Sequence, residues 1–458
     1  MTEPKRRTPV AADVDVLVCG GGPAGYCAAI AAAEEGAGAL LVERGSFLGG
    51  SATQALVLPL MTFHASPSEQ IVRGVGQRLV EEVMRLGGGP GHVPDPLGCA
   101  ATITPADPEA LKQAVLGLTA RSGARLLLQS SVVAPLLSGR RVCGAIVENK
   151  SGRQALRAKV VVDATGDADL AFRAKAPCVY GRESDALAQP MTLMFRMSGV
   201  DGAAVRAAIR ENPDDFVLSP EARRDLDSLP ILAVSGFFSL VRKAQAEGRL
   251  GDFRDRVLYF ELPRAGEVIV NMTRVLRRSG VDAAQLTAAS LEGYEQARQA
   301  EEFLRRDVPG FSRARLVELA SQIGVRETRR IVGRATLGTD DVLEGRLPAD
   351  GVARGAFPID LHSPDGSGLT LKRMKPGASY SIPYGCLLPK NLEGLLVAGR
   401  AISASHEAAA SARLSPTCMA LGEAAGVAAA LSCARKLPPS KLKVAELRRR
   451  LLERGAVV

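Results

Sequence analysis

Aromatic residues and histidine are scarce in this chain of 458 residues. It has no tryptophan, four histidines and an aromatic content of 4%. A surface that binds nucleic acid combines basic residues with aromatic side chains on which bases stack. The net charge of +9 comes from arginines scattered over the whole chain, with short runs only at KRR, LRRR and ETRR. We therefore expect no nucleic-acid partner, and we interpret the basic charge as favouring anionic small molecules.

Cysteine pairs with the spacing of a metal site are also absent. The eight cysteines form no CxxC pair and no Cys/His cluster typical of zinc. Most of them lie in apolar segments, as the buried, reduced thiols of cytoplasmic proteins do. The sequence thus predicts no bound metal and reduced cysteines.

Long hydrophobic runs are missing as well. Apolar stretches are interrupted by charge or glycine well before they reach the length of a bilayer crossing. The N-terminal stretch MTEPKRRTPVAADVD is basic and lacks the apolar core of a secretory signal, so it reads as a disordered lead-in. We expect a cytoplasmic protein without a membrane span.

A glycine-rich turn follows an apolar stretch in residues 16–29, VLVCGGGPAGYCAA. Gly20, Gly22 and Gly25 fit the pattern G-x-G-x-x-G. In this pattern the first glycine allows a tight turn, and the second lets the backbone approach a diphosphate at the start of a helix. The third lets helix and strand pack closely. Pro23 falls in the first helical turn, where proline is tolerated. The stretch predicts a dinucleotide-binding strand–turn–helix unit.

The second strand of this unit, GALLVER, ends on Glu43. A carboxylate at this place accepts hydrogen bonds from a ribose diol. Because NAD and FAD share an adenosine diphosphate moiety, these features do not distinguish the two cofactors. The next residues, RGSFLGGSATQ, form a glycine- and hydroxyl-rich turn instead of another regular strand–helix unit. This turn favours an extended cofactor, a flavin.

Two further segments are expected at the same edge of the sheet. The strand KVVVDATG ends at Thr165–Gly166, with Asp167 next. A late helix opens at SPTCMALGEAAG, with Ser415 as the expected N-cap and Pro416 at the first helical position. The partial positive charge at such a helix start suits a reduced, anionic flavin. A capped core helix without a ligand is the alternative.

Several of these segments together resemble a known family. They are the glycine motif, Glu43–Arg44, Gly49–Gly50, DATGDADL, IGVRETRRIVG and VAGRAISASHEAAASARLSPTCMALGEAAG. Between about Asp13 and Cys433 the chain resembles the bacterial FAD-dependent oxidoreductases on the glutathione-reductase-like fold. The fumarate-reductase-like branch looks nearer than the flavoprotein hydroxylases, whose late GDAAH motif reads AGRAIS here.

The resemblance implies an α/β fold with non-covalent FAD. A Rossmann-like FAD-binding domain would comprise residues 1–175 and 386–458, interrupted by a mixed α+β substrate domain at 176–385. An acid that holds the ribityl chain in that branch is replaced here by Arg400. The expected FAD-binding residues are Gly20, Gly22, Pro23, Ala24, Gly25, Glu43, Arg44, Gly49, Gly50, Ser51, Thr53, Val133, Thr165, Gly166, Asp167, Gly399, Arg400, Ser415, Thr417, Cys418 and Met419.

Five residues are candidates for work on the substrate. The resemblance of ARLSPT to the NRLGGN element of that branch implies that Arg413 binds a substrate carboxylate; a salt bridge is the alternative. His406 could move a proton, or be structural. Arg326 in VRETRR could bind an anion or belong to a buried, self-neutralised network. His64 and Tyr384 are further candidates.

We therefore expect hydride transfer between a small, anionic organic substrate and flavin N5. The electron acceptor stays open among a quinone, another protein and oxygen, and no oligomeric state is predicted. A nicotinamide-dependent dehydrogenase is one alternative. A flavin-binding module with a structural or RNA-modification role is another.

Overall fold

A seven-stranded sheet carries the glycine-rich turn in the computed structural model, which describes residues 7–366 and 368–458. Strands β8, β2, β1 and β11 are parallel neighbours in that order. The far edge of β11 pairs with β23 in parallel near its carboxyl end and with the β9–β10 hairpin in antiparallel fashion. The α/β prediction is therefore confirmed. Residues 1–6 of the expected lead-in lie outside the described residues. The expectation of disorder is wrong for residues 10–15, which form the first part of a strand that pairs with β11.

The bounds of this sheet follow the apolar stretches of the sequence. Its strands are β1 (Val10–Cys19), β2 (Ala39–Val42), β8 (Arg125–Leu127), β9 (Ser131–Ser138), β10 (Arg141–Asn149), β11 (Gly152–Asp163) and β23 (Leu395–Val397). β2 and the carboxyl halves of β1 and β11 are buried on both faces, as their unbroken runs of valine and leucine require.

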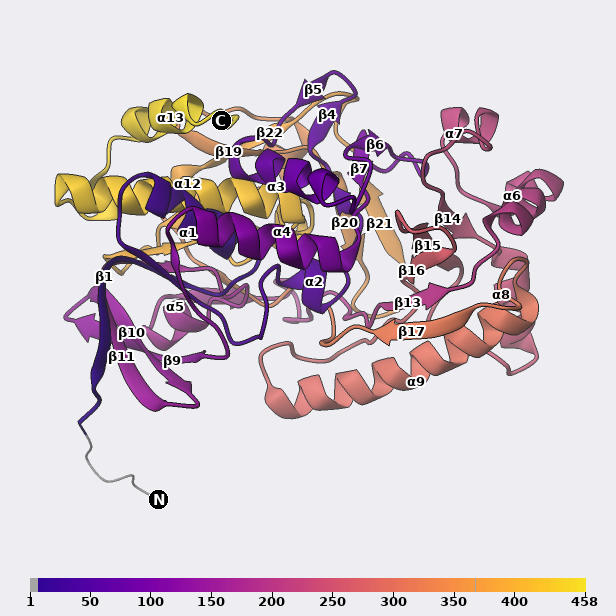
Figure 1. Ribbon diagram of the computed structural model, residues 1–458, viewed down its shortest axis with the longest axis horizontal. Helices are drawn as coiled ribbons and strands as arrows, with labels where there is room; N and C mark the ends of the chain where they lie inside the picture. The colour runs from indigo at the N-terminus through magenta and orange to yellow at the C-terminus, as the bar shows by residue number, and fades with distance from the viewer. Residues whose placement is uncertain (1–6, 367) are drawn as a thin grey trace.

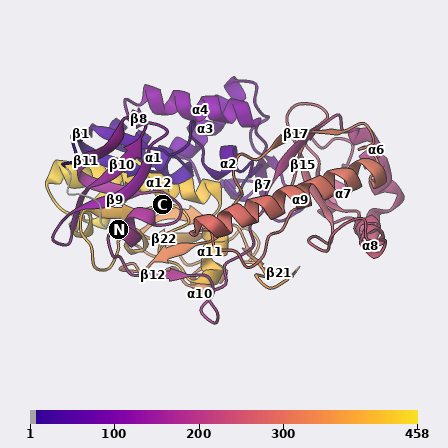
Figure 2. The same ribbon diagram turned by 90° about the horizontal axis from the view of Figure 1, so that it is seen from below.

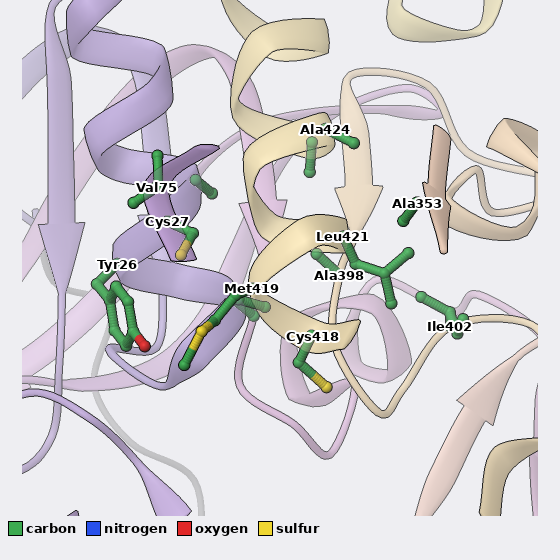
Figure 3. Packing of buried hydrophobic residues seen from close by; sticks show 14 of the residues in the cluster. Tyr26, Cys27, Val75, Ala353, Ala398, Ile402, Cys418, Met419, Leu421 and Ala424 are labelled. Carbon is green, nitrogen blue, oxygen red and sulfur yellow. The ribbon is translucent and has the colours of Figure 1, made fainter. Parts of the chain in front are cut away.

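Helices α1 (Pro23–Glu34) and α12 (Ser415–Arg435) pack against each other beside this sheet, although they lie almost 400 residues apart. Their close approach depends on two glycines of α12. A Cβ at Gly422 would lie 2.1 Å from the carbonyl oxygen of Ala24, and one at Gly426 would lie 2.2 Å from that of Ala28. Figure 3 shows Tyr26 and Cys27 of α1 next to Met419 of α12 in the resulting core.

One helix of the described chain, α12, is long and apolar enough to cross a membrane by length and composition alone. Of its most apolar window, 78% is buried inside the protein. Its neighbours are α1, α3, α13 and the strands β1, β11 and β19. Burial in the protein core therefore accounts for its apolar character.

The start of α12 differs from the prediction. The helix begins at Ser415, and its N-cap is Leu414, which offers no side-chain hydrogen bond. The prediction of Ser415 as N-cap is therefore wrong by one residue, because Pro416 occupies the second helical position instead of the first. The helix start is left without a capping side chain and without an acidic residue in its first turn.

A second, five-stranded antiparallel sheet has the order β14-β15-β16-β13-β17. Its strands are β13 (Phe195–Ser198), β14 (Ala233–Gly236), β15 (Val257–Glu261), β16 (Glu267–Val270) and β17 (Arg315–Leu319). One face packs on helices α6 (Gly202–Glu211), α8 (Phe238–Ala246) and α9 (Ala283–Asp307), with which it forms a core of its own. In Figures 1 and 2 these elements make up the end of the molecule away from β1, β10 and β11.

The remaining elements connect or flank the two sheets. The short strands are β3 (Leu60–Met61), β4 (His64–Ser66), β5 (Glu69–Gln70), β6 (Val93–Pro94), β7 (Thr102–Thr104), β12 (Cys178–Tyr180), β18 (Arg329–Ile331), β19 (Gly351–Gly355), β20 (Ile359–His362), β21 (Leu369–Lys372) and β22 (Tyr380–Pro383). The other helices are α2 (Ser51–Gln54), α3 (Gly74–Arg85), α4 (Pro108–Arg121), α5 (Asp169–Arg173), α7 (Pro220–Arg224), α10 (Thr339–Leu343), α11 (His406–Ala412) and α13 (Val444–Glu453), with 3₁₀ turns at Pro213–Asp215, Tyr384–Leu387 and Pro439–Lys441.

The hydrophobic cores show which segments pack together. Buried residues between 195 and 314 form the core of the second sheet. Val352, Ile359 and Tyr380 instead pack into the same core as α1 and α12. The division of the chain into domains, with the insert at 176–385, stays a prediction.

Candidate functional site

A cavity of about 310 Å³ lies at the carboxyl ends of β1, β2, β11 and β23. We call it the sheet-edge cavity. It brings together most of the residues expected to bind FAD, which are Gly20, Gly22, Pro23, Ala24, Glu43, Arg44, Gly50, Ser51, Thr165, Gly166, Asp167, Gly399, Arg400, Ser415 and Cys418. Others among the expected residues do not line it, namely Gly25, Gly49, Thr53, Val133, Thr417 and Met419.

Each glycine of the motif is needed for a different structural reason. A Cβ at Gly25 would lie 1.7 Å from the carbonyl oxygen of Gly20, so the helix could not sit this close to the strand with any other residue. At Gly22 a Cβ would meet only the Cα of Gly50, at 3.7 Å. Bare backbone at Gly22 therefore borders the cavity, and α1 begins there without a capping side chain or an acidic residue. Free N–H groups at this helix start suit a diphosphate.

Glu43 is buried at the end of β2. Its carboxylate accepts hydrogen bonds from the backbone N–H of Gly21 at 2.6 Å and from that of Gly45 at 2.7 Å. Oε1, which accepts from Gly45, also accepts from Gln54 Nε2 at 3.4 Å. A carboxylate oxygen has about two acceptor positions, so Oε2, which accepts from Gly21, keeps a lone pair for a further donor. These hydrogen bonds fix the orientation of the carboxylate at the cavity wall. Its contact with a ribose stays a prediction.

Arg400 forms an ion pair in the loop after β23. Its Nη2 lies 2.6 Å from Oδ1 of Asp167, and its guanidinium lies over Gly166. Asp167 also accepts a hydrogen bond from Thr328 Oγ1 at 2.7 Å. The arginine and the aspartate thus link the loops after β23 and β11 at the cavity.

The residues lining the sheet-edge cavity fit FAD. Two long helices, α1 and α12, begin at the cavity without capping side chains or acidic residues in their first turns, and so their starts attract anionic groups. The bare backbone at Gly22 leaves room for close approach of a cofactor.

A second cavity of about 370 Å³ adjoins the first, and we call it the arginine cavity. The two share the wall residues Ser51, Gly324, Val325, Arg400, Arg413 and Ser415. Its lining includes the arginines Arg254, Arg256, Arg274, Arg326, Arg373, Arg400 and Arg413, against the acids Asp255 and Asp360. The described lining is therefore strongly cationic.

Arg413 lies at the boundary between the two cavities. Its Nε donates to Ala410 O at 3.3 Å, and its Nη2 lies 3.7 Å from Oδ2 of Asp360. Burial lowers the pKa of the Arg413 guanidinium, and Asp360 partly offsets this effect. Arg326, in the same cavity, donates through Nη1 to Pro190 O and to Thr192 Oγ1, both at 2.6 Å. Its pKa is lowered by burial and by the neighbouring arginines.

Asp360 and His362 of β20 also line the arginine cavity, where Asp360 lies next to Arg413 and His362 next to Arg274. Oδ2 of Asp360 lies 3.3 Å from Nε2 of His362. Burial acts to raise the pKa of Asp360, but His362, Arg413 and Arg326 outweigh it, so the carboxyl stays ionised. Burial and Arg326 lower the pKa of His362 to about 3, which keeps the imidazole neutral at neutral pH.

Three of the expected substrate residues do not line either of these two cavities. His406 Nδ1 lies 2.8 Å from Glu327 Oε1, within a buried network that includes the Glu327–Arg330 ion pair. His64 contacts Thr102, and the hydroxyl of Tyr384 donates to Pro439 O at 3.0 Å. The structure thus brings only Arg413 and Arg326, of the five candidates, to the site.

Sequence reasoning missed Asp360, His362, Arg254 and Arg274. The signals were weak: FRDR precedes the strand VLYFE, and IDLH alternates apolar and polar residues. Charges before a strand are common and carry no functional meaning by themselves. These residues meet because strands from distant parts of the sequence end beside one another.

Comparisons with known proteins show which family the chain resembles. A family model described as FAD dependent oxidoreductase matches residues 15–451. No curated protein sequence matches the chain. A geranylgeranyl bacteriochlorophyll reductase-like protein from Thermoplasma acidophilum is 14% identical over 97% of this chain and 84% of that chain, with a TM-score of 0.45. The myxobacterial chondrochloren halogenase is 15% identical over 97% and 79%, with a TM-score of 0.49. A flavin-dependent brominase is 14% identical over 96% and 83%, with a TM-score of 0.50, a likeness of fold alone.

Proposed function

The chain belongs to the family of FAD-dependent oxidoreductases, and from this premise we propose that it transfers a hydride between FAD and a small, anionic organic substrate. The observation that supports this most is the arginine cavity, which shares a wall with the sheet-edge cavity through Arg400 and Arg413. Membership of this family decides for FAD and against the nicotinamide alternative. It also makes the chain an enzyme, against the alternative of a purely structural module.

We propose that the sheet-edge cavity holds the FAD without a covalent bond. Backbone N–H groups at the start of α1 would bind the diphosphate beside Gly22, and Glu43 would accept hydrogen bonds from the ribose. The start of α12 would face the flavin ring, since Ser415 lines both cavities and Cys418 lines the sheet-edge cavity. When bound, FAD supplies two-electron chemistry by accepting or donating a hydride.

Arg413 would bind the anionic group of the substrate at the boundary of the two cavities. Asp360 orients its guanidinium from one side, and the carbonyl oxygen of Ala410 holds Nε from another. A planar guanidinium held in this way can present its remaining N–H groups to a carboxylate. Arg326 adds positive charge, and the neutral His362 adds none. Asp360 is therefore the opposing charge beside Arg413, since Asp255 is paired with Arg256.

An anaerobic screen of organic acids tests this proposal. The FAD-loaded protein is mixed with each acid in the absence of oxygen, and the absorbance of the oxidised flavin is followed; a reduced-protein series tests the reverse direction. We expect an acid to change the redox state of the flavin, and its neutral amide to do so far more slowly. Equal rates for acid and amide would contradict the assignment of the arginine cavity to an anionic substrate.

A further inference from the structure

The free face of the five-stranded sheet forms one wall of the arginine cavity. Along β15 the side chains alternate: Val257 and Tyr259 point into the core with α9, whereas Leu258 and Phe260 line the cavity. Such alternation is the ordinary period of a strand. Phe260 lies opposite Ala233 of β14 and packs with Leu97 in a small apolar cluster. This end of the cavity is therefore hydrophobic.

The other end of the same wall is cationic. Arg254 and Arg256 precede β15, and Arg274 follows β16. Because β15 and β16 are antiparallel neighbours, the start of one and the end of the other lie side by side. The cavity lining thus changes from cationic to apolar along a single strand, from Arg254 toward Phe260.

Arg254 is unlike the other arginines of this cavity. Its side chain is 8% exposed, its Nε is buried without a partner, and its guanidinium has no hydrogen bond or ion pair with any residue in the described ranges 7–366 and 368–458. The nearby carboxylates are engaged elsewhere, since Asp255 pairs with Arg256 at 2.7 Å and Asp360 lies against His362. Burial and Arg274 lower the pKa of Arg254 to about 10, so it stays a cation at neutral pH.

A buried cation without a partner destabilises a protein unless a ligand supplies the opposite charge. Packing alone does not explain a guanidinium at this position, because the folded protein would be more stable with an apolar side chain of similar volume there. The arrangement is typical of a binding site that trades stability for function.

We infer that the substrate is an amphipathic organic acid. Arg413 and Arg254 would bind its anionic group together, and its apolar body would lie over Leu97, Leu258 and Phe260. The charges of these two arginines both lower the pKa of Arg326. The inference rests on the proposed function and narrows its substrate class. A cavity of about 370 Å³ falls within the range of sites for drug-sized ligands. Leu369 and Leu371 of β21 also line the cavity and extend the apolar surface.

Binding of straight-chain acids to the FAD-loaded, oxidised protein tests this inference without turnover. The probes are butanoate, hexanoate, octanoate and decanoate, with succinate as a dianion that lacks an apolar body, and affinity is measured by calorimetry. We expect affinity to rise about two- to fourfold for each buried methylene. We expect succinate to bind no more tightly than butanoate. A flat series, or succinate as the tightest ligand, would overturn the inference.

Two variants test the cationic end and the apolar end of the cavity separately. Arg254→Met should lower the affinity for every monocarboxylate by the same factor, about 10- to 150-fold, because a charge-assisted hydrogen bond is lost. It should also raise the Tm of the ligand-free protein, because an unpaired buried charge is removed. Phe260→Ser should instead flatten the dependence on chain length and leave butanoate affinity nearly unchanged. If Arg254→Met lowers the Tm and leaves affinity unchanged, the residue is structural.

Arg206→Met is the matched control, since Arg206 of α6 forms an ion pair at 3.1 Å with Glu261, the last residue of β15, and does not line the cavity. It should lower the Tm without affecting acid binding.

The measurements distinguish a failure of this inference from a failure of the proposed function. A flat chain-length series with a short acid that still reduces the flavin refutes the inference alone. Tight, Arg254-dependent binding with no acid changing the flavin redox state refutes the proposed reaction.

Discussion

Replacing Arg413 by lysine keeps the positive charge at the boundary of the two cavities but removes the planar fork. In the structure, Nε of Arg413 donates to Ala410 O and Nη2 donates to Asp360 O at 3.4 Å, while Nη1 donates to no residue within the described ranges. Nη1 is therefore the group that is free for a ligand. A lysine ammonium cannot hold both protein acceptors and a substrate anion in the same geometry.

The size of the effect follows from that lost contact. A hydrogen bond to a charged group contributes about 1.5–3 kcal/mol, which corresponds to roughly 10- to 150-fold in rate if it is made in the transition state. Misplacement of the reacting carbon could extend the loss to about a thousandfold. We expect the FAD content and the Tm to change little, because Asp360 keeps a cationic neighbour.

The assay is the rate of flavin reduction under anaerobic conditions, with FAD released by acid and counted per chain. Arg196→Lys is the control, since Arg196 pairs with Glu267 and Glu318 outside both cavities. Its rate should match that of the unchanged protein. If Arg413→Lys loses FAD while the remaining holoprotein keeps its rate, Arg413 serves the cofactor and the reasoning is refuted.

Three further predictions concern the cofactor, the core and pH. Glu43→Gln should weaken FAD binding about tenfold or more, because an amide group would replace one of the two oriented acceptors; unchanged affinity in a titration of the apoprotein would remove Glu43 from the ribose. Gly422→Ala should lower the free energy of unfolding by about 1–3 kcal/mol, because its Cβ meets the backbone of Ala24, whereas Gly117→Ala, which meets only a flexible side chain, should not destabilise. The pKa of His362 is lowered from 6.5 to about 3 in the folded state, so the unfolded chain binds an extra proton between these values and stability falls as the pH decreases through this window. Between pH 7 and pH 5 the unchanged protein should lose about 2 kcal/mol more than His362→Gln in urea unfolding, and equal losses would contradict the burial argument.

The cofactor half of the site was accessible from the sequence because it is built from local patterns. A strand, a glycine turn and a helix occur within residues 16–29, and Glu43 closes the next strand at a characteristic distance. Asp163 ends β11 and Glu43 directly follows β2, and these two strands are the parallel neighbours of β1, so the loops after them meet at one edge. The error at Ser415 had a local cause, since Pro416 is tolerated at the first or second helical position and does not fix the helix start by itself.

The substrate-binding half of the site could not be predicted from the sequence in the same way. Arg254, Arg274 and Asp360 belong to three segments without a shared motif, and each charge by itself is typical of a solvated loop. Only the pairing of β15 with β16, and the position of β20 against them, brings these charges into one buried cavity. His406 and Tyr384, which lie close in sequence to cofactor motifs, point instead into separate hydrogen-bonded environments.

The sequence by itself determined the α/β class and the glycine turn of a dinucleotide site, because this turn is a local pattern. Gly20 has a φ of +104°, and a Cβ at Gly25 would meet the carbonyl oxygen of Gly20, only five residues away. The tertiary structure alone decided which charges share a low-dielectric cavity. The inference that the guanidinium of Arg254 binds an anion depends on its burial and on the absence of a partner among the described residues. Both properties depend on contacts between distant segments, and an amino-acid pattern does not contain them.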